Sequence, residues 1–127
     1  MKPESSGYLA KARHCLASAK TIAAAEVPDV AAREAYLAAY HAAEANERTG
    51  KAAKTHRGVK IQSNRLARDE ARISRELFAF IDEGYQFKSI ADYGVGPAID
   101  EIAADDATSA IDTAALFIDT IAQLLPP

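Results

Sequence analysis

Apolar residues recur every three or four positions along most of the chain, which is the period of an α-helix with one buried face. Residues 6–25 form the first such segment, and a second runs from Asp29 to about Arg48. Ser5 or Ser6 is the predicted cap of the first helix, and Asp29 is the predicted cap of the second. The predicted buried positions are Leu9, Ala12, Leu16, Ala19 and Ala23 in the first segment, and Ala32, Ala35, Tyr36, Ala39, Tyr40 and Ala43 in the second.

The same period predicts three more helices. A short third helix is predicted to begin at Thr55, and a fourth to run from about Asp69 to Tyr93 with a kink at Gly84. The run Gly-Val-Gly-Pro at 94–97 predicts a loop, and the helix after it has a clear apolar stripe, made of Ala107, Ile111, Ala114, Ile118, Ile121 and Leu125. No strand pattern competes with these segments. We therefore expect an all-α fold, an antiparallel bundle of four to five helices, in a single domain of residues 1–127.

Composition supports one helical core. The 127 residues are 49% hydrophobic but only 7% aromatic, so small aliphatic side chains must fill the interior. Cys15 is the only cysteine and cannot form an internal disulfide, and it is predicted to be core filler. No segment reaches the roughly 20 apolar residues of a membrane span, so we expect no membrane association and a cytoplasmic location.

Charge divides the chain into three blocks. Residues 1–47 carry five basic and six acidic groups. Residues 48–75 carry nine basic and two acidic groups, and residues 76–127 carry one basic and ten acidic groups. The middle block, at +7, stands out from a chain of net charge −3. Such a basic segment is typical of a site for phosphate or RNA, although a solvated helix face paired with the acidic C-terminal part explains it equally well.

Several kinds of site are not supported by the sequence. The three histidines lie far apart, no His-Glu-x-x-His or paired-cysteine motif occurs, and no glycine-rich loop follows a strand. No metal or other cofactor is therefore predicted.

The remaining chemistry lies in the basic segment. His56 can exchange a proton near neutral pH, and Arg48 can stabilise a phosphoryl group on which charge develops. The predicted phosphate contacts are Lys51, Lys54, Arg57 and Lys60. Together these side chains match a metal-independent ribonuclease site. The alternative is that Thr55 and His56 begin a helix and that the lysines are only solvated.

Two further groups are candidate supporting residues. His41, Glu44 and Arg48 are spaced by three and four positions, which places them on one flank of the second helix. Such a row is usually a solvated face. Tyr93 is predicted to be a structural residue with its hydroxyl near the basic segment.

Four short sequences together resemble the HEPN-domain proteins, specifically a poorly characterised bacterial subfamily: ERTGK at 47–51, AKTHRGV at 53–59, RLA at 65–67 and IADY at 90–93. The resemblance extends from Tyr8 to the last helix. It implies an all-α bundle, commonly a homodimer, that often cleaves RNA as a toxin or defence nuclease beside a nucleotidyltransferase antitoxin. In catalytic members an Arg and a His line a cleft across the dimer, and the corresponding residues here are Arg48 and His56. Seven residues separate this pair, against four to six in those members.

Three functions follow as expectations. The first is an RNA endonuclease, in which His56 is the general acid or base and Arg48 stabilises the transition state. The second is a non-catalytic module that binds a nucleotide or an acidic partner through the same basic residues. The third is a structural dimeric bundle whose charges confer solubility.

Overall fold

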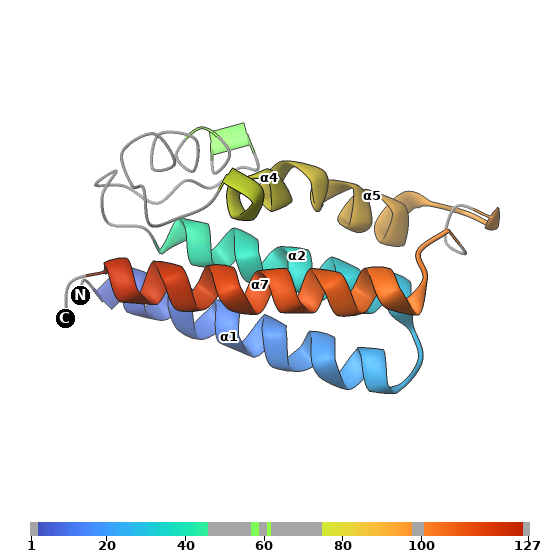
Figure 1. The fold of residues 1–127 in the computed structure, drawn as a ribbon, viewed down its shortest axis with the longest axis horizontal. Helices are drawn as coiled ribbons and strands as arrows, with labels where there is room; N and C mark the ends of the chain where they lie inside the picture. Colours follow the sequence, from blue (N-terminus) through green and yellow to red (C-terminus); the bar gives the residue numbers. More distant parts are fainter. Residues whose placement is uncertain (1–2, 46–56, 59–60, 62–74, 98–100, 126–127) are drawn as a thin grey trace.

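The computed structural model describes residues 3–45, 57–58, 61, 75–97 and 101–125. The helices with described bounds are α1 (Pro3–Ala24), α2 (Pro28–Glu44), α4 (Arg75–Glu83), α5 (Tyr85–Tyr93) and α7 (Ala104–Leu124). In Figure 1, α1, α2 and α7 run side by side, and α4 and α5 lie along one side of them. The predicted all-α bundle is confirmed.

Alanine forms most of the interface between α1 and α2. Seven alanines of α2 are buried in the same hydrophobic core as Leu9, Ala12, Cys15 and Ala19 of α1: Ala31, Ala32, Ala35, Ala38, Ala39, Ala42 and Ala43. With no side chain beyond Cβ, such positions let helix axes approach closely. The prediction that Cys15 is core filler is confirmed, whereas Leu16 and Ala23 are only half-buried.

Larger side chains fill the part of the core that α7 and α4 contribute. All six apolar positions predicted for the last helix are buried, and Phe117 joins them with no exposed surface. Leu77, Phe80 and Ile81 of α4 complete this part of the core. The helical period therefore identified the buried face of α7 correctly.

The helix ends differ from the sequence predictions. α1 begins at Pro3, so Ser5 and Ser6 lie inside it, and Ser5 is buried. Val27 is the N-terminal flanking residue of α2, with Pro28 in the first turn, and no side chain caps this end. The predicted caps at Ser5, Ser6 and Asp29 are therefore wrong, because in each case the helix starts before the polar residue.

The turn between α1 and α2 closes through backbone bonds. The Val27 N–H donates to the Ile22 carbonyl oxygen at 3.3 Å, and Glu26 has φ +65. This bond, with a left-handed residue before it, is the Schellman arrangement that terminates many helices. At the start of α7, the Ala103 N–H donates to Asp106 Oδ2 at 2.8 Å, which satisfies an otherwise free amide.

The predicted kink at Gly84 is present as the junction between α4 and α5. Gly84 keeps a right-handed backbone, with φ −65 and ψ −21. A Cβ atom here would lie 2.5 Å from the Phe80 carbonyl oxygen and 2.9 Å from Tyr36 Cδ1. Glycine is therefore required by close packing against the preceding turn of α4 and against Tyr36 of α2. The predicted loop follows α5, and Gly96 in it has φ +57.

Candidate functional site

A buried polar pair lies at the end of α2. His41 Nδ1 and Glu44 Oε1 are 2.6 Å apart, and their side chains are only 12% and 7% exposed. The prediction that these residues share one flank of the helix is confirmed. The expectation of a solvated row is wrong for both, because little of either side chain reaches solvent.

Aromatic rings extend from this pair along α2. The Tyr40 and His41 rings meet edge to face, with centroids 5.6 Å apart and planes at 89°. Tyr36 lies 6.0 Å from Tyr40 and 6.0 Å from Tyr85 of α5. The row connects the junction between α4 and α5 to the last turn of α2.

Burial changes the acidity of these phenols. Burial, followed by the negative charge of Glu44, raises the pKa of the Tyr40 hydroxyl. The pKa of Tyr36 is raised further, again chiefly by burial. Both phenols therefore stay neutral at physiological pH.

The arrangement has a clear chemical consequence. A carboxylate bonded to Nδ1 fixes the orientation of the imidazole ring. The Glu44 side chain in this bond is only 7% exposed. The end of α2, which precedes Arg48 by four residues, therefore presents no exposed carboxylate from this pair.

Most of the predicted catalytic and phosphate-binding residues lie outside the described residues: Arg48, Lys51, Lys54, His56 and Lys60. The predicted supporting residue Thr55 also lies outside them. Arg57 is described, with a helical backbone and an exposed side chain, and its role as a phosphate contact stays a prediction. The predicted end of the second helix at about Arg48 and the predicted starts at Thr55 and Asp69 also lie outside the described residues.

Tyr93 lies at the end of α5 and is 75% exposed. The Lys88 ammonium group lies over its ring, 5.7 Å from the centroid. Contacts of this kind contribute little at exposed sites. The expectation that Tyr93 is a structural residue is therefore not supported by its packing.

Asp92, the residue before Tyr93, connects α5 to α2. Its Oδ1 accepts from Arg33 Nε of α2 at 2.6 Å, and its Oδ2 accepts from Lys88 Nζ at 3.0 Å. The hydrogen bond from Lys88, with that from Arg33, lowers the pKa of Asp92. The spacing of four residues between Lys88 and Asp92 could have predicted their ion pair from the sequence. The bond from Arg33 joins two different helices, so no local spacing in the sequence indicates it.

Within the part of the chain that the structure describes, no group of three or more His, Cys, Asp or Glu side chains could hold a metal ion. None of the described helices is long and apolar enough to cross a membrane.

A comparison with family models identifies the class of protein that this bundle represents. The model of the HEPN domain matches residues 5–124, which is nearly the whole chain. The chain therefore belongs to the HEPN family, as the four short sequences predicted. A search of curated proteins gives no significant match.

Proposed function

We propose that this HEPN protein is a metal-independent RNA endonuclease. His56 acts as general acid or base, and Arg48 stabilises the phosphoryl group in the transition state. Lys51, Lys54 and Arg57 bind the RNA backbone. Family membership supports the proposal, because HEPN domains are often linked to RNA cleavage or nucleotide binding.

The observation that carries the proposal is the buried pair of His41 and Glu44. It lies at the end of α2, four residues before Arg48 in the sequence, and the Glu44 side chain in it is only 7% exposed. An exposed carboxylate there would repel a phosphate backbone. The pair thus supports the reactive segment by fixing the last turn of α2 and by preserving its positive charge.

The proposed assembly is a homodimer in which Arg48 and His56 of both copies line one cleft. In the cell, the proposed role is that of a toxin or defence nuclease, controlled by an antitoxin of the nucleotidyltransferase type. These proposals rest on the family and on the charge pattern of the sequence.

The test is cleavage of single-stranded RNA in the presence of EDTA. The variants are Arg48→Ala, His56→Ala and, as a control, His14→Ala, which removes an exposed imidazole from α1. General acid or base catalysis contributes about 10²- to 10⁴-fold, so His56→Ala should lose at least about 100-fold. The control should retain full activity. Equal cleavage by His56→Ala and the wild type would remove His56 from the mechanism.

One outcome would support the non-catalytic alternative. If no variant and no wild-type preparation cleaves RNA, binding of a nucleotide or short RNA should be measured against salt concentration. Affinity that falls with salt, and that falls again in Lys54→Ala or Arg57→Ala, would indicate a phosphate-binding module. The exposed side chain of Arg57 is compatible with this role.

A further inference from the structure

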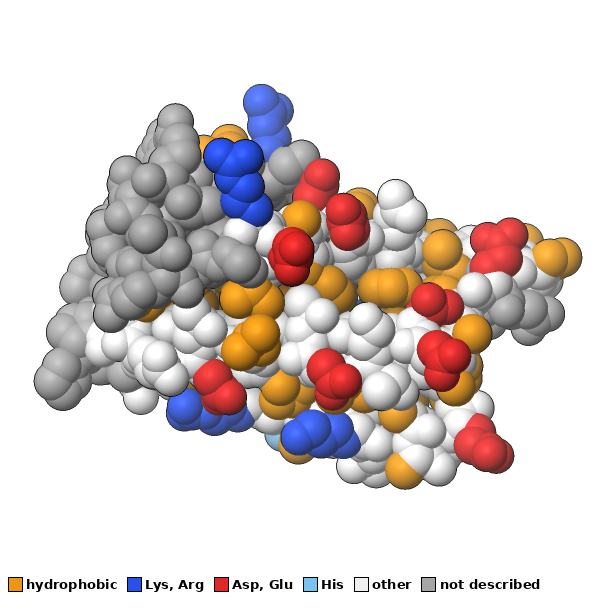
Figure 2. All heavy atoms as spheres, viewed as in Figure 1, with side chains coloured by type: hydrophobic (Ala, Val, Ile, Leu, Met, Phe, Trp, Pro, Cys, Tyr) orange, Lys and Arg blue, Asp and Glu red, His pale blue; other side chains and the backbone are white. Residues whose placement is uncertain are grey.

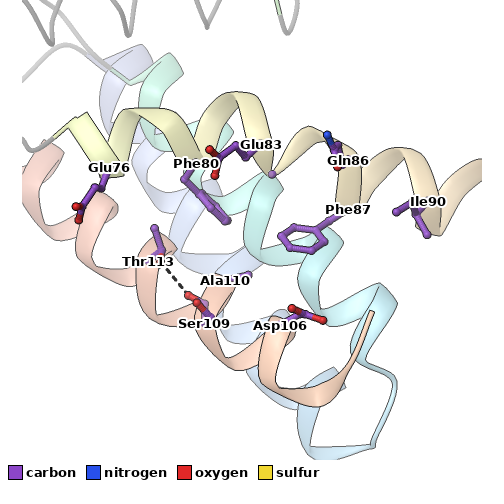
Figure 3. Close-up of a pocket in the computed structure, with 11 residues that line it drawn as sticks. Glu76, Phe80, Glu83, Gln86, Phe87, Ile90, Asp106, Ser109, Ala110 and Thr113 are labelled. Atoms are coloured by element: carbon purple, nitrogen blue, oxygen red, sulfur yellow. Dashed lines mark hydrogen bonds between the residues drawn. The ribbon is translucent and has the colours of Figure 1, made fainter. Parts of the chain in front are cut away.

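A surface groove of about 490 Å³ lies between the α4–α5 pair and α7. Figure 3 shows Phe80 and Phe87 pointing from α4 and α5 toward α7, where Ala110 and Ser109 form the opposite wall. Together with Ile90, these side chains give the groove an apolar floor. Phe87 and Ile90 are only half-buried, so part of this floor contacts solvent.

The rim of the groove is acidic on both sides. Glu76 and Glu83 lie on α4, and Asp106 lies at the start of α7. Neither Lys nor Arg is among the described residues that line the groove. In Figure 2, hydrophobic side chains lie between acidic ones on this face of the molecule.

We propose that this groove binds an amphipathic, basic helix of a partner protein. The apolar face of that helix would pack on Phe87 and Ile90, and its Lys or Arg side chains would pair with Glu76, Glu83 and Asp106. An amphipathic helix in a groove between helices is a common recognition mode, with anchors at i, i+3 or i+4, and i+7. Residues 106–113 of α7 border the groove. At 1.5 Å per residue this is roughly 11 Å, which matches the distance between anchors i and i+7.

The charge of the rim favours a basic helix over a nucleic acid, an anionic lipid or a second copy of the chain as the occupant of the groove. A nucleic acid or an anionic lipid would bring phosphates against the carboxylates of the rim. A second copy of the chain in a two-fold dimer would place the same surface opposite itself, because such interfaces are self-complementary. The acidic rim of one copy would then face the acidic rim of the other, and the carboxylates would repel each other. A basic partner helix has neither conflict.

This inference is independent of the proposed ribonuclease site, because none of the groove residues belongs to it. The probe is a synthetic 14-residue helix with Leu at the anchor positions and Lys on the flanks, compared with the same peptide carrying Glu in place of Lys. Binding is measured by fluorescence anisotropy, and the site is mapped by amide chemical shifts in the full chain. We expect the Lys peptide to bind, with shifts in residues 76–90 and 106–113, and the Glu peptide not to bind.

The decisive variant is Glu76→Gln/Glu83→Gln, which removes two rim charges and keeps the shape of the side chains. Loss of two partly exposed ion pairs should weaken binding of the Lys peptide about tenfold. The matched control, Asp112→Asn/Asp119→Asn, removes two exposed charges of α7 that do not line the groove and should change affinity less than about twofold.

Three results would overturn the proposal. They are failure of the Lys peptide to bind, equal binding of both peptides, and chemical-shift changes located elsewhere. A fourth result would identify a different occupant: if the wild type self-associates and Glu76→Gln/Glu83→Gln is monomeric, the groove is filled by a second copy. Circular dichroism of each variant shows whether a loss reflects unfolding.

Discussion

Replacement of Gly84 tests the close contact between α2 and the α4–α5 junction. Glycine inside a helical backbone normally costs stability, and Gly→Ala gains about 1 kcal/mol where the methyl group fits. Gly84 has such a backbone, so helix propensity alone predicts that Gly84→Ala stabilises the protein. The atoms packed around Gly84 predict instead that Gly84→Ala destabilises the protein.

The added methyl group would meet atoms that cannot move away. Its Cβ would lie 2.5 Å from the Phe80 carbonyl oxygen and 2.9 Å from Tyr36 Cδ1. Tyr36 is 1% exposed and is held between the rings of Tyr40 and Tyr85. Overpacking of this kind costs typically 1–3 kcal/mol, and two such short contacts indicate the upper end of that range. After the gain in propensity, the net loss should be about 2 kcal/mol.

The assay is urea unfolding followed by circular dichroism. With a slope of roughly 2 kcal/mol per M, Gly84→Ala should lower the midpoint by about 1 M. Gly7→Ala is the control, because Gly7 lies in α1 and nothing lies within 4 Å of its added Cβ. That variant should gain about 0.5–1 kcal/mol. If Gly84→Ala gains stability as Gly7→Ala does, the reasoning from close packing is refuted.

Two other predictions concern the ion pairs. Because hydrogen bonds from Lys88 and Arg33 lower the pKa of Asp92, the ionised carboxylate stabilises the fold above its unfolded pKa, and this contribution is lost as the pH falls through the lowered value. Asp92→Asn should therefore cost less than about 1 kcal/mol at pH 7, given the partial exposure of the pair, and this cost should shrink as the pH falls through the lowered pKa. Unfolding measured at pH 7 and across the acid range checks this, and a cost that does not change with pH would contradict it. For the pair of His41 and Glu44, each single change to Ala should cost about 2–3 kcal/mol, because one buried polar group loses its partner. The double variant should cost at least about 1 kcal/mol less than the sum, so additive losses in a double-mutant cycle would show that the pair is not coupled.

The helical period was sufficient to predict the bundle, because burial on one face leaves a direct record in the spacing of apolar residues. Ile111, Ile118 and Ile121 illustrate this in α7. Helix starts were harder, since Pro28 begins α2 without any side-chain cap and a polar residue nearby is not evidence of a boundary.

The site was predicted only in part for a similar reason. Spacing placed His41 and Glu44 side by side, but their burial depends on how closely neighbouring helices approach, which is a property of the packed bundle. The bond between Arg33 and Asp92 joins residues 59 positions apart, and the groove depends on where α5 lies after Gly84. Local sequence contains neither kind of information.

The alanine interface between α1 and α2 also has a consequence for the order of folding. Alanine loses no side-chain rotamer freedom on burial, so these two helices can join without the entropy cost of ordering long side chains. They are adjacent in sequence and connected by a turn of three residues, 25–27, and such local contacts form fast. During synthesis this hairpin leaves the ribosome before the residues that follow it. We expect α1 and α2 to dock before the basic segment and the acidic C-terminal part of the chain emerge, which would limit premature association between those opposite charges.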